Sequence, residues 1–150
     1  MSTIILQGRH LCVSAAILLL SLAGCSQSDG LISVTGTVTF EGEPVEKGAI
    51  SMIPVDGAGV TAGGVIAGGR YHVRSSPGKV SVLIYGQRKT ENPNASPEEI
   101  ERGMNFSTKQ YVPAAYNDQS KLRITISESN RNFDFDLTQQ GEIPAEMSGT

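Results

Sequence analysis

The feature that most constrains the fold of this chain is the alternation of apolar and polar side chains in short stretches between residues 34 and 137. Successive side chains of a β-strand point to opposite faces of the sheet, so such a stretch places one face in a core and one in water. Gly and Pro fall between the stretches, as at Glu41–Pro44 and Ser76–Gly78, where they favour turns. About seven short strands predict an all-β, Greek-key β-sandwich. The clearest stretches are 34–40, 48–54, 70–74, 80–85, 122–127 and 133–137.

The alternation lapses in two places. Residues 56–69 contain six glycines, which indicates a loop with a short edge strand around Val65-Ile66. Residues 87–121 form a long loop, within which Ser96-Pro97-Glu98-Glu99 predicts a helix start, with Ser at the N-cap, Pro at N1 and Glu at N3. This helix is expected to be short and to end at Gly103.

The N-terminus has the parts of an export signal. Arg9 and His10 precede an apolar run from Leu11 to Leu22, which is shorter than the ~20 residues that span a bilayer. The run ends in Leu22-Ala23-Gly24-Cys25, which resembles the lipobox of bacterial lipoproteins. The alternatives are an ordinary cleaved signal with a chance cysteine, or an uncleaved anchor.

The lipobox resemblance implies that Cys25 carries a lipid on its thiol and that cleavage before it removes residues 1–24 as a signal peptide. The membrane is then a partner through the anchor at Cys25, and Ser26 favours the outer membrane by the same resemblance. We expect residues 25–30 to be a tether, residues 31–138 to be the β-sandwich, and the polar residues 139–150 to be a disordered tail.

The composition of the mature chain excludes several kinds of chemistry. Removal of residues 1–24 takes away Arg9, so 11 basic residues remain of 12, against 15 acidic ones, and this acidic balance argues against a nucleic-acid partner. Cys25 is then the remaining cysteine and His72 the remaining histidine. Thiol catalysis and zinc–cysteine sites are excluded, and a triad would have one imidazole. We therefore predict a protein that is not an enzyme and binds no cofactor.

Two groups of residues are candidates for ligand binding. Asp134 and Asp136 share a strand face and could bind calcium with Glu128 or Asp118, but such a pair more often keeps a strand soluble, so no metal site is predicted. Tyr85, Tyr111 and Tyr116 could stack on a sugar, and the alternative for Tyr111 and Tyr116 is that they anchor their loop in the core. His72 is expected at a sheet edge or in solvent.

The order of the turns and strands resembles carboxypeptidase-regulatory-like domains, which have a transthyretin-like fold. The stretches that carry the resemblance are 34–45, 48–54, 69–71, 77–82, 112–117 and 132–137. The last two resemble a subset of short bacterial lipoproteins. The resemblance implies a domain without catalytic residues. The sequence lacks the Tyr-Arg-Gly-Ser ending and the several histidines of the transthyretin-like hydrolase.

These observations predict a non-catalytic, lipid-anchored protein of the cell envelope that acts as a structural or protein-interaction module. It is expected to be exported and to sit at the outer membrane or face the periplasm, with an unidentified envelope protein or glycan as its partner. A carbohydrate-binding module that uses exposed tyrosines and the 87–121 insertion is the alternative, and a transthyretin-fold hydrolase is a third. An exposed edge strand could also pair two copies.

Overall fold

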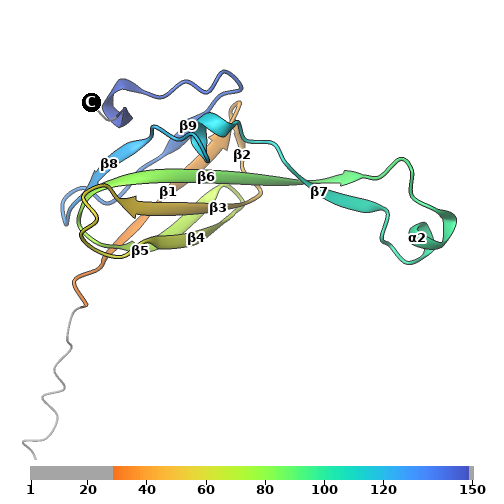
Figure 1. The fold of residues 1–150 in the computed structure, drawn as a ribbon, viewed down its shortest axis with the longest axis horizontal. Helices are drawn as coiled ribbons and strands as arrows, with labels where there is room; N and C mark the ends of the chain where they lie inside the picture. The colour runs from red at the N-terminus through yellow and green to blue at the C-terminus, as the bar shows by residue number, and fades with distance from the viewer. Residues whose placement is uncertain (1–28, 149–150) are drawn as a thin grey trace, which may run out of the picture.

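The computed structural model describes residues 29–148 and shows an all-β protein with one short α-helix, which confirms the predicted fold class. The β-rich body and a projecting two-stranded arm are both visible in Figure 1. The elements in chain order are β1 (Ile32–Phe40), β2 (Glu43–Pro44), β3 (Lys47–Pro54), β4 (Ala62–Ala67), β5 (Arg70–Ser75), β6 (Gly78–Glu91), α2 (Pro97–Glu101), β7 (Phe106–Gln110), the 3₁₀ turn η1 (Ala114–Tyr116), β8 (Arg123–Ile126), β9 (Phe135–Leu137) and the 3₁₀ turn η2 (Ala145–Met147).

The strands form one curled sheet in the order β2-β1-β5-β4-β3-β6-β7, with β8 paired to β6 and β9 paired to β1. The pairs are antiparallel except for β1 with β9, which is parallel. β4 pairs with β3 from Ala62 to Ala67 but with β5 only at Ile66 and Ala67. The sheet therefore opens beyond the β4–β5 turn, and its two halves enclose the core as a β-sandwich.

Most of the core comes from apolar positions that the alternation predicts, and Val45, Ile66, Val112 and Tyr116 add to it from outside those stretches. Val34 and Val38 of β1, and Ile50 and Met52 of β3, are completely buried. The inward positions of β6, β8 and β9 are also buried, and they include Val82, Ile84, Ile126 and Leu137. Burial of an aliphatic side chain stabilises a fold by about 1.5–3 kcal/mol, so these rows hold the sandwich together without a disulfide.

The prediction of an edge strand near Val65-Ile66 is wrong. β4 is longer than predicted and lies inside the sheet, between β5 and β3. Its alternation is masked because two of its positions are glycines. A Cβ atom on Gly64 would lie 2.6 Å from Cγ2 of Val73 and 2.9 Å from the carbonyl oxygen of His72, so the backbones approach too closely for a side chain there.

The prediction of a long loop over residues 87–121 is also wrong in part. β6 continues to Glu91 and pairs with β7, and the helix α2 lies at the far end of this hairpin. Figure 1 shows the hairpin extending away from the sandwich as an arm. Residues 87–91 and 106–110 are all exposed. Because no core lies beneath these strands, neither face needs apolar side chains, and the alternation that reveals a strand is missing.

The tail predicted to be disordered from residue 139 is ordered as far as Ser148. The side chains of Ile143 and Met147 pack against the core, and Leu122 bridges to Ser148. The hydroxyl of Tyr116 donates a hydrogen bond of 2.6 Å to the carbonyl oxygen of Glu142. Two apolar side chains and one buried hydroxyl therefore hold a segment that looks polar in sequence.

Candidate functional site

The predicted lipidation site, Cys25, lies outside the described residues. The other residues of the cleavage motif, Leu22, Ala23 and Gly24, lie outside them as well. Asp29 is the first described residue of the predicted tether, and its Oδ1 lies 2.6 Å from Nη2 of Arg74 on β5. None of the helices within residues 29–148 has the length and apolar character needed to cross a membrane. The first described residue is therefore held beside β5 by an ion pair.

The two tyrosines named as sugar-binding candidates have different surroundings. Tyr116 is completely buried, and its hydroxyl also accepts a 3.0 Å hydrogen bond from the backbone N–H of Thr138. Its ring has no face to offer a sugar, so Tyr116 is a core anchor. Tyr111 is half-buried at the base of the arm, where its ring meets Phe40 edge-on at 5.3 Å between centroids. Burial raises the pKa of Tyr111.

His72 and the two aspartates interact with hydroxyl groups of β1. His72 is exposed on β5, and its Nε2 contacts the hydroxyl of Ser33. Asp134 accepts hydrogen bonds of 2.8 Å from both the backbone N–H and the hydroxyl of Thr37, and Asp136 accepts one of 2.7 Å from the hydroxyl of Thr39. Asp134 and Asp136 therefore link β9 to β1.

The other predicted calcium ligands lie elsewhere. Asp118 accepts a 2.9 Å hydrogen bond from the hydroxyl of Tyr85, which raises the pKa of that tyrosine. Within residues 29–148, no three side chains of the His, Cys, Asp and Glu types gather closely enough to hold a metal ion. Glu128 is on the loop after β8.

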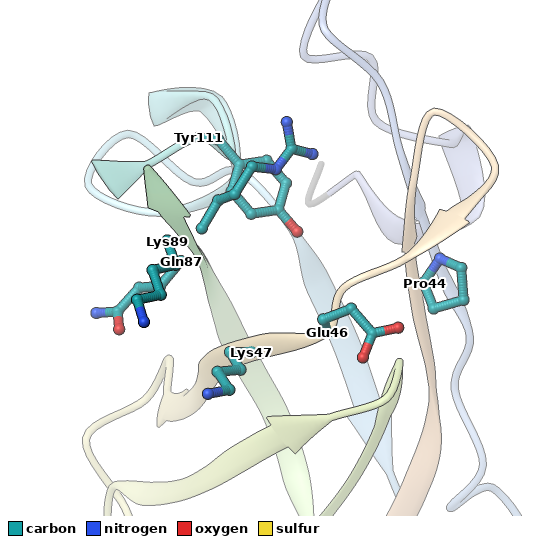
Figure 2. Close-up of a pocket in the computed structure, with 7 residues that line it drawn as sticks. Pro44, Glu46, Lys47, Gln87, Lys89 and Tyr111 are labelled. Atoms are coloured by element: carbon teal, nitrogen blue, oxygen red, sulfur yellow. The ribbon is translucent and has the colours of Figure 1, made fainter. Parts of the chain in front are cut away.

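A hollow of about 310 Å³ lies where the arm leaves the sandwich. Its lining comes from the β2–β3 segment and from the base of the arm, and a second hollow of about 320 Å³ continues along the arm past Lys89 to Phe106. Figure 2 shows Lys47, Gln87 and Lys89 on one side of the first hollow, with Glu46 and Pro44 on the other. The arm and the sandwich thus form a continuous, mainly cationic surface.

Two of the cations lie over aromatic rings. The guanidinium carbon of Arg88 is 4.6 Å from the centroid of the Tyr111 ring, and Nζ of Lys89 is 3.8 Å from the centroid of the Phe106 ring. A cation over a ring at this distance gains about 0.5–1 kcal/mol at an exposed site. These contacts hold the cationic groups in place along the arm while leaving them accessible to solvent.

The far end of the arm has the opposite charge. Glu91 ends β6, and the helix α2 adds Glu98, Glu99 and Glu101, while Arg102 is the one cation between residues 91 and 105. The predicted capping box is present: Ser96 N–H donates to Glu99 at 2.8 Å, and Glu99 N–H donates to the Ser96 hydroxyl at 3.2 Å. The backbone N–H of Ser96 lowers the pKa of the Glu99 carboxyl.

Large apolar side chains are exposed at this end. Ile100 of α2 is 55% exposed and Met104 is 59% exposed, and Phe106 at the start of β7 is 39% exposed. Exposed apolar groups rimmed by charges are typical of protein contact sites.

We name residues 91–105 the tip of the arm. The four cationic residues at its other end, Lys47, Arg88, Lys89 and Lys109, are named the basic base.

Sequence reasoning placed the helix of this site but missed the two strands that carry it. Thr90, Phe106 and Thr108 are residues with strand propensity, and this is the signal that could have suggested a hairpin. Without alternation, such a signal is weak.

Comparison with known proteins assigns no family. No family model matches the sequence, and no curated protein is significantly similar to it. Two solved structures show a distant similarity to the chain. A candidate adhesin from Bacteroides ovatus ATCC 8483 is 17% identical with a TM-score of 0.42, over 78% of this chain and 49% of that chain. A 9R-lipoxygenase from Cyanothece PCC8801 is 15% identical with a TM-score of 0.36, over 73% of this chain and 16% of that chain. The chain thus spans less than half of either protein, and similarities this distant assign it no activity.

Proposed function

We propose that this chain is a non-catalytic, lipid-anchored interaction module of the cell envelope, and that its arm is the surface that contacts a protein partner. The observation that carries the proposal is the arm itself, a hairpin exposed on both faces that contributes nothing to the core of the sandwich. Ordering a residue costs about 1–2 kcal/mol in backbone entropy, so an arm without its own core is best explained by a contact outside the chain.

The lipid anchor is supported by the sequence Leu22-Ala23-Gly24-Cys25. The absence of catalysis is supported by the composition, since a cleaved and acylated chain keeps no free thiol and a single imidazole at His72. The resemblance to carboxypeptidase-regulatory-like domains points the same way, because those domains serve as non-catalytic companions. A location at the outer membrane or facing the periplasm belongs to the same proposal.

The carbohydrate-binding alternative receives less support. It relied on Tyr85, Tyr111 and Tyr116, of which Tyr116 is buried. The hydroxyl of Tyr85 donates a hydrogen bond to Asp118. One face of the Tyr111 ring lies under Arg88, and Phe40 packs against the ring as well. A sugar would need a free aromatic face on which to stack. The exposed apolar groups of the tip, Ile100 and Met104, suit a protein contact better.

The experiment that tests the proposal compares three forms of the full chain in native envelopes. The first is unchanged, the second carries Cys25→Ala, and the third has residues 89–108 replaced by Asn-Gly. Arg88 and Lys109 are directly opposite each other, so a two-residue turn can close the shortened hairpin. Crosslinking and affinity capture from each form, with membrane fractionation, give the two readouts.

We expect Cys25→Ala to release the protein from the membrane and the shortened arm to stay on the membrane but lose its captured partners. The unchanged sandwich core provides the control for folding, since both variants should keep the unfolding temperature of the parent. Capture of the same partners by the shortened form would contradict the role of the arm. Retention of Cys25→Ala on the membrane would contradict the anchor.

A further inference from the structure

One edge of the arm has no strand paired to it. β3 pairs with β6 as far as Gly48 opposite Gly86, and among residues 29–148 no strand continues beside β6 on that side. On the other side the carbonyl of Gly86 accepts from Tyr111 N–H, and Asn92 N–H donates to the carbonyl of Asn105. In an antiparallel strand the backbone N–H and C=O groups of successive residues point to opposite sides of the strand. The backbone groups of the even-numbered residues of β6 therefore point toward β7, and those of the odd-numbered residues point toward the open edge.

The outward-facing backbone groups of the arm therefore belong to Lys89 and Glu91, with Thr90 between them. All three residues are exposed. A strand edge of this kind pairs readily with another strand, and backbone hydrogen bonds provide the affinity while the side chains decide the register.

The charges of the arm restrict what that other strand can be. The base is cationic through Lys47, Arg88, Lys89 and Lys109, while the tip carries four carboxylates against one guanidinium. A second arm that lies antiparallel to the first places each acidic tip beside the partner's basic base. The arm is thus complementary to a second copy of itself in the antiparallel direction, and in the parallel direction like charges would meet.

The same reasoning selects the register. Only odd-numbered residues can form the hydrogen-bonded pairs across this edge, so a two-fold axis can pass through Lys89, Thr90 or Glu91. An axis at Lys89 sets two lysines opposite each other, and an axis at Glu91 sets two glutamates opposite. An axis at Thr90 sets Lys89 opposite the partner's Glu91, twice. Directly opposed charges of opposite sign stabilise a sheet, and like charges destabilise it.

We infer that two copies of this chain pair through the open edge of β6, in antiparallel register about a two-fold axis at Thr90. This inference rests on the proposed function, since it names the partner of the arm. The hollows of about 310 and 320 Å³ beside this edge provide the space into which the partner's tip extends. So few paired residues give a weak contact in solution, and a shared membrane anchor raises the effective concentration of the two copies.

Disulfide crosslinking of the full chain in native membranes tests the inference. In this register the two Thr90 residues form a non-hydrogen-bonded pair with Cα atoms roughly 4.5 Å apart, which a disulfide can bridge. Thr108→Cys is the matched control, because Thr108 is equally exposed and lies opposite Lys89 on β7. The two copies of Thr108 would be three strand spacings apart across the sheet and two residues apart along it, roughly 16 Å in all. Both variants carry the same native cysteines, so any background product is common to them.

Under mild oxidation we expect Thr90→Cys to give a product of twice the chain mass and Thr108→Cys to give none above background. Charge reversal is then added to Thr90→Cys. Lys89→Glu or Glu91→Lys alone should lower the yield roughly tenfold, since each turns two attractive pairs into repulsive ones. The double reversal restores the opposite charges and should restore the product.

An equal or larger product from Thr108→Cys would overturn the inference, as would the absence of a product from Thr90→Cys. Failure of the double reversal to rescue would overturn the register. Crosslinking of Thr90→Cys to a different protein would overturn the second copy as the partner while leaving the proposed function intact. Membrane retention is scored in the same fractions, and its loss would count against the anchor rather than against the pairing.

Discussion

Removal of the Tyr116 hydroxyl is a direct test of how the C-terminal segment is held. Tyr116→Phe keeps the ring, which is completely buried, and deletes the oxygen that donates to the Glu142 carbonyl at 2.6 Å and accepts from Thr138 N–H at 3.0 Å. The change therefore leaves two backbone groups without their partner while the packing of the core is kept.

The magnitude follows from these two bonds. A neutral hydrogen bond contributes about 0.5–1.5 kcal/mol net, so the loss of both should lower the free energy of unfolding by about 2 kcal/mol. With a urea dependence of about 2 kcal/mol per molar, the unfolding midpoint should fall by about 1 M. Tyr85→Phe is the matched control, because its hydroxyl bonds to Asp118 in an exposed position and water can replace it. The control should change the free energy of unfolding by less than about 0.5 kcal/mol.

The assay is urea unfolding followed by far-ultraviolet circular dichroism, with limited proteolysis of the native protein beside it. Tyr116→Phe should also expose the segment from Gln139 to Ser148 to cleavage, since the bond to Glu142 is one of its attachments. If Tyr116→Phe and Tyr85→Phe have the same midpoint and the same proteolysis pattern, the hydroxyl does not hold this segment and the reasoning is wrong.

Further outcomes concern β1 and the arm. Gly36→Ala should destabilise the fold by about 3 kcal/mol or more in urea unfolding, because its Cβ would lie 1.8 Å from the Phe133 carbonyl oxygen. Gly63→Ala meets nothing closer than 3.8 Å and should cost far less; equal midpoints would contradict the close approach at β1. The capping box predicts a pH effect confined to the tip. The pKa of Glu99 is lowered from 4.5, so its contribution to helix stability is present above pH 4.5 and is lost as the pH falls through the lowered pKa. The amide signals of Ser96 and Glu99 should therefore titrate in that acidic range in NMR spectra, and a titration centred above pH 4.5 would refute the cap.

The extent to which the fold could be predicted depends on where the core lies. Val34, Val38, Ile50 and Met52 stand out in sequence because each faces the same buried interior, and their strands were predicted within a few residues. β4 was predicted too short and at an edge because glycine replaces the side chain at Gly64, where another strand leaves no room for a Cβ. A position that is most constrained sterically thus carries the weakest apolar signal.

The tail and the candidate site depended on contacts that a sequence pattern does not encode. Tyr116 could be predicted as either a core anchor or a sugar-binding residue, and the choice between them required the position of Glu142, 26 residues later in the chain. Asp134 and Asp136 had the spacing of ligands on one strand face. Their oxygens are instead bonded to Thr37 and Thr39, which lie on the parallel neighbour β1.

The strands of the arm were not predicted from the sequence for the same reason that they suit the proposed function. Alternation marks a strand because burial selects apolar side chains on one face, and residues 87–91 and 106–110 have no face beneath which the core continues. The same lack of a core leaves the charges of the arm free to be sorted along its length, with Lys89 near the base and Glu91 toward the tip. If the open edge of β6 meets a second copy, that copy supplies backbone hydrogen bonds and opposed charges in place of a core. The local pattern is then the one expected for a strand whose partner is on another chain.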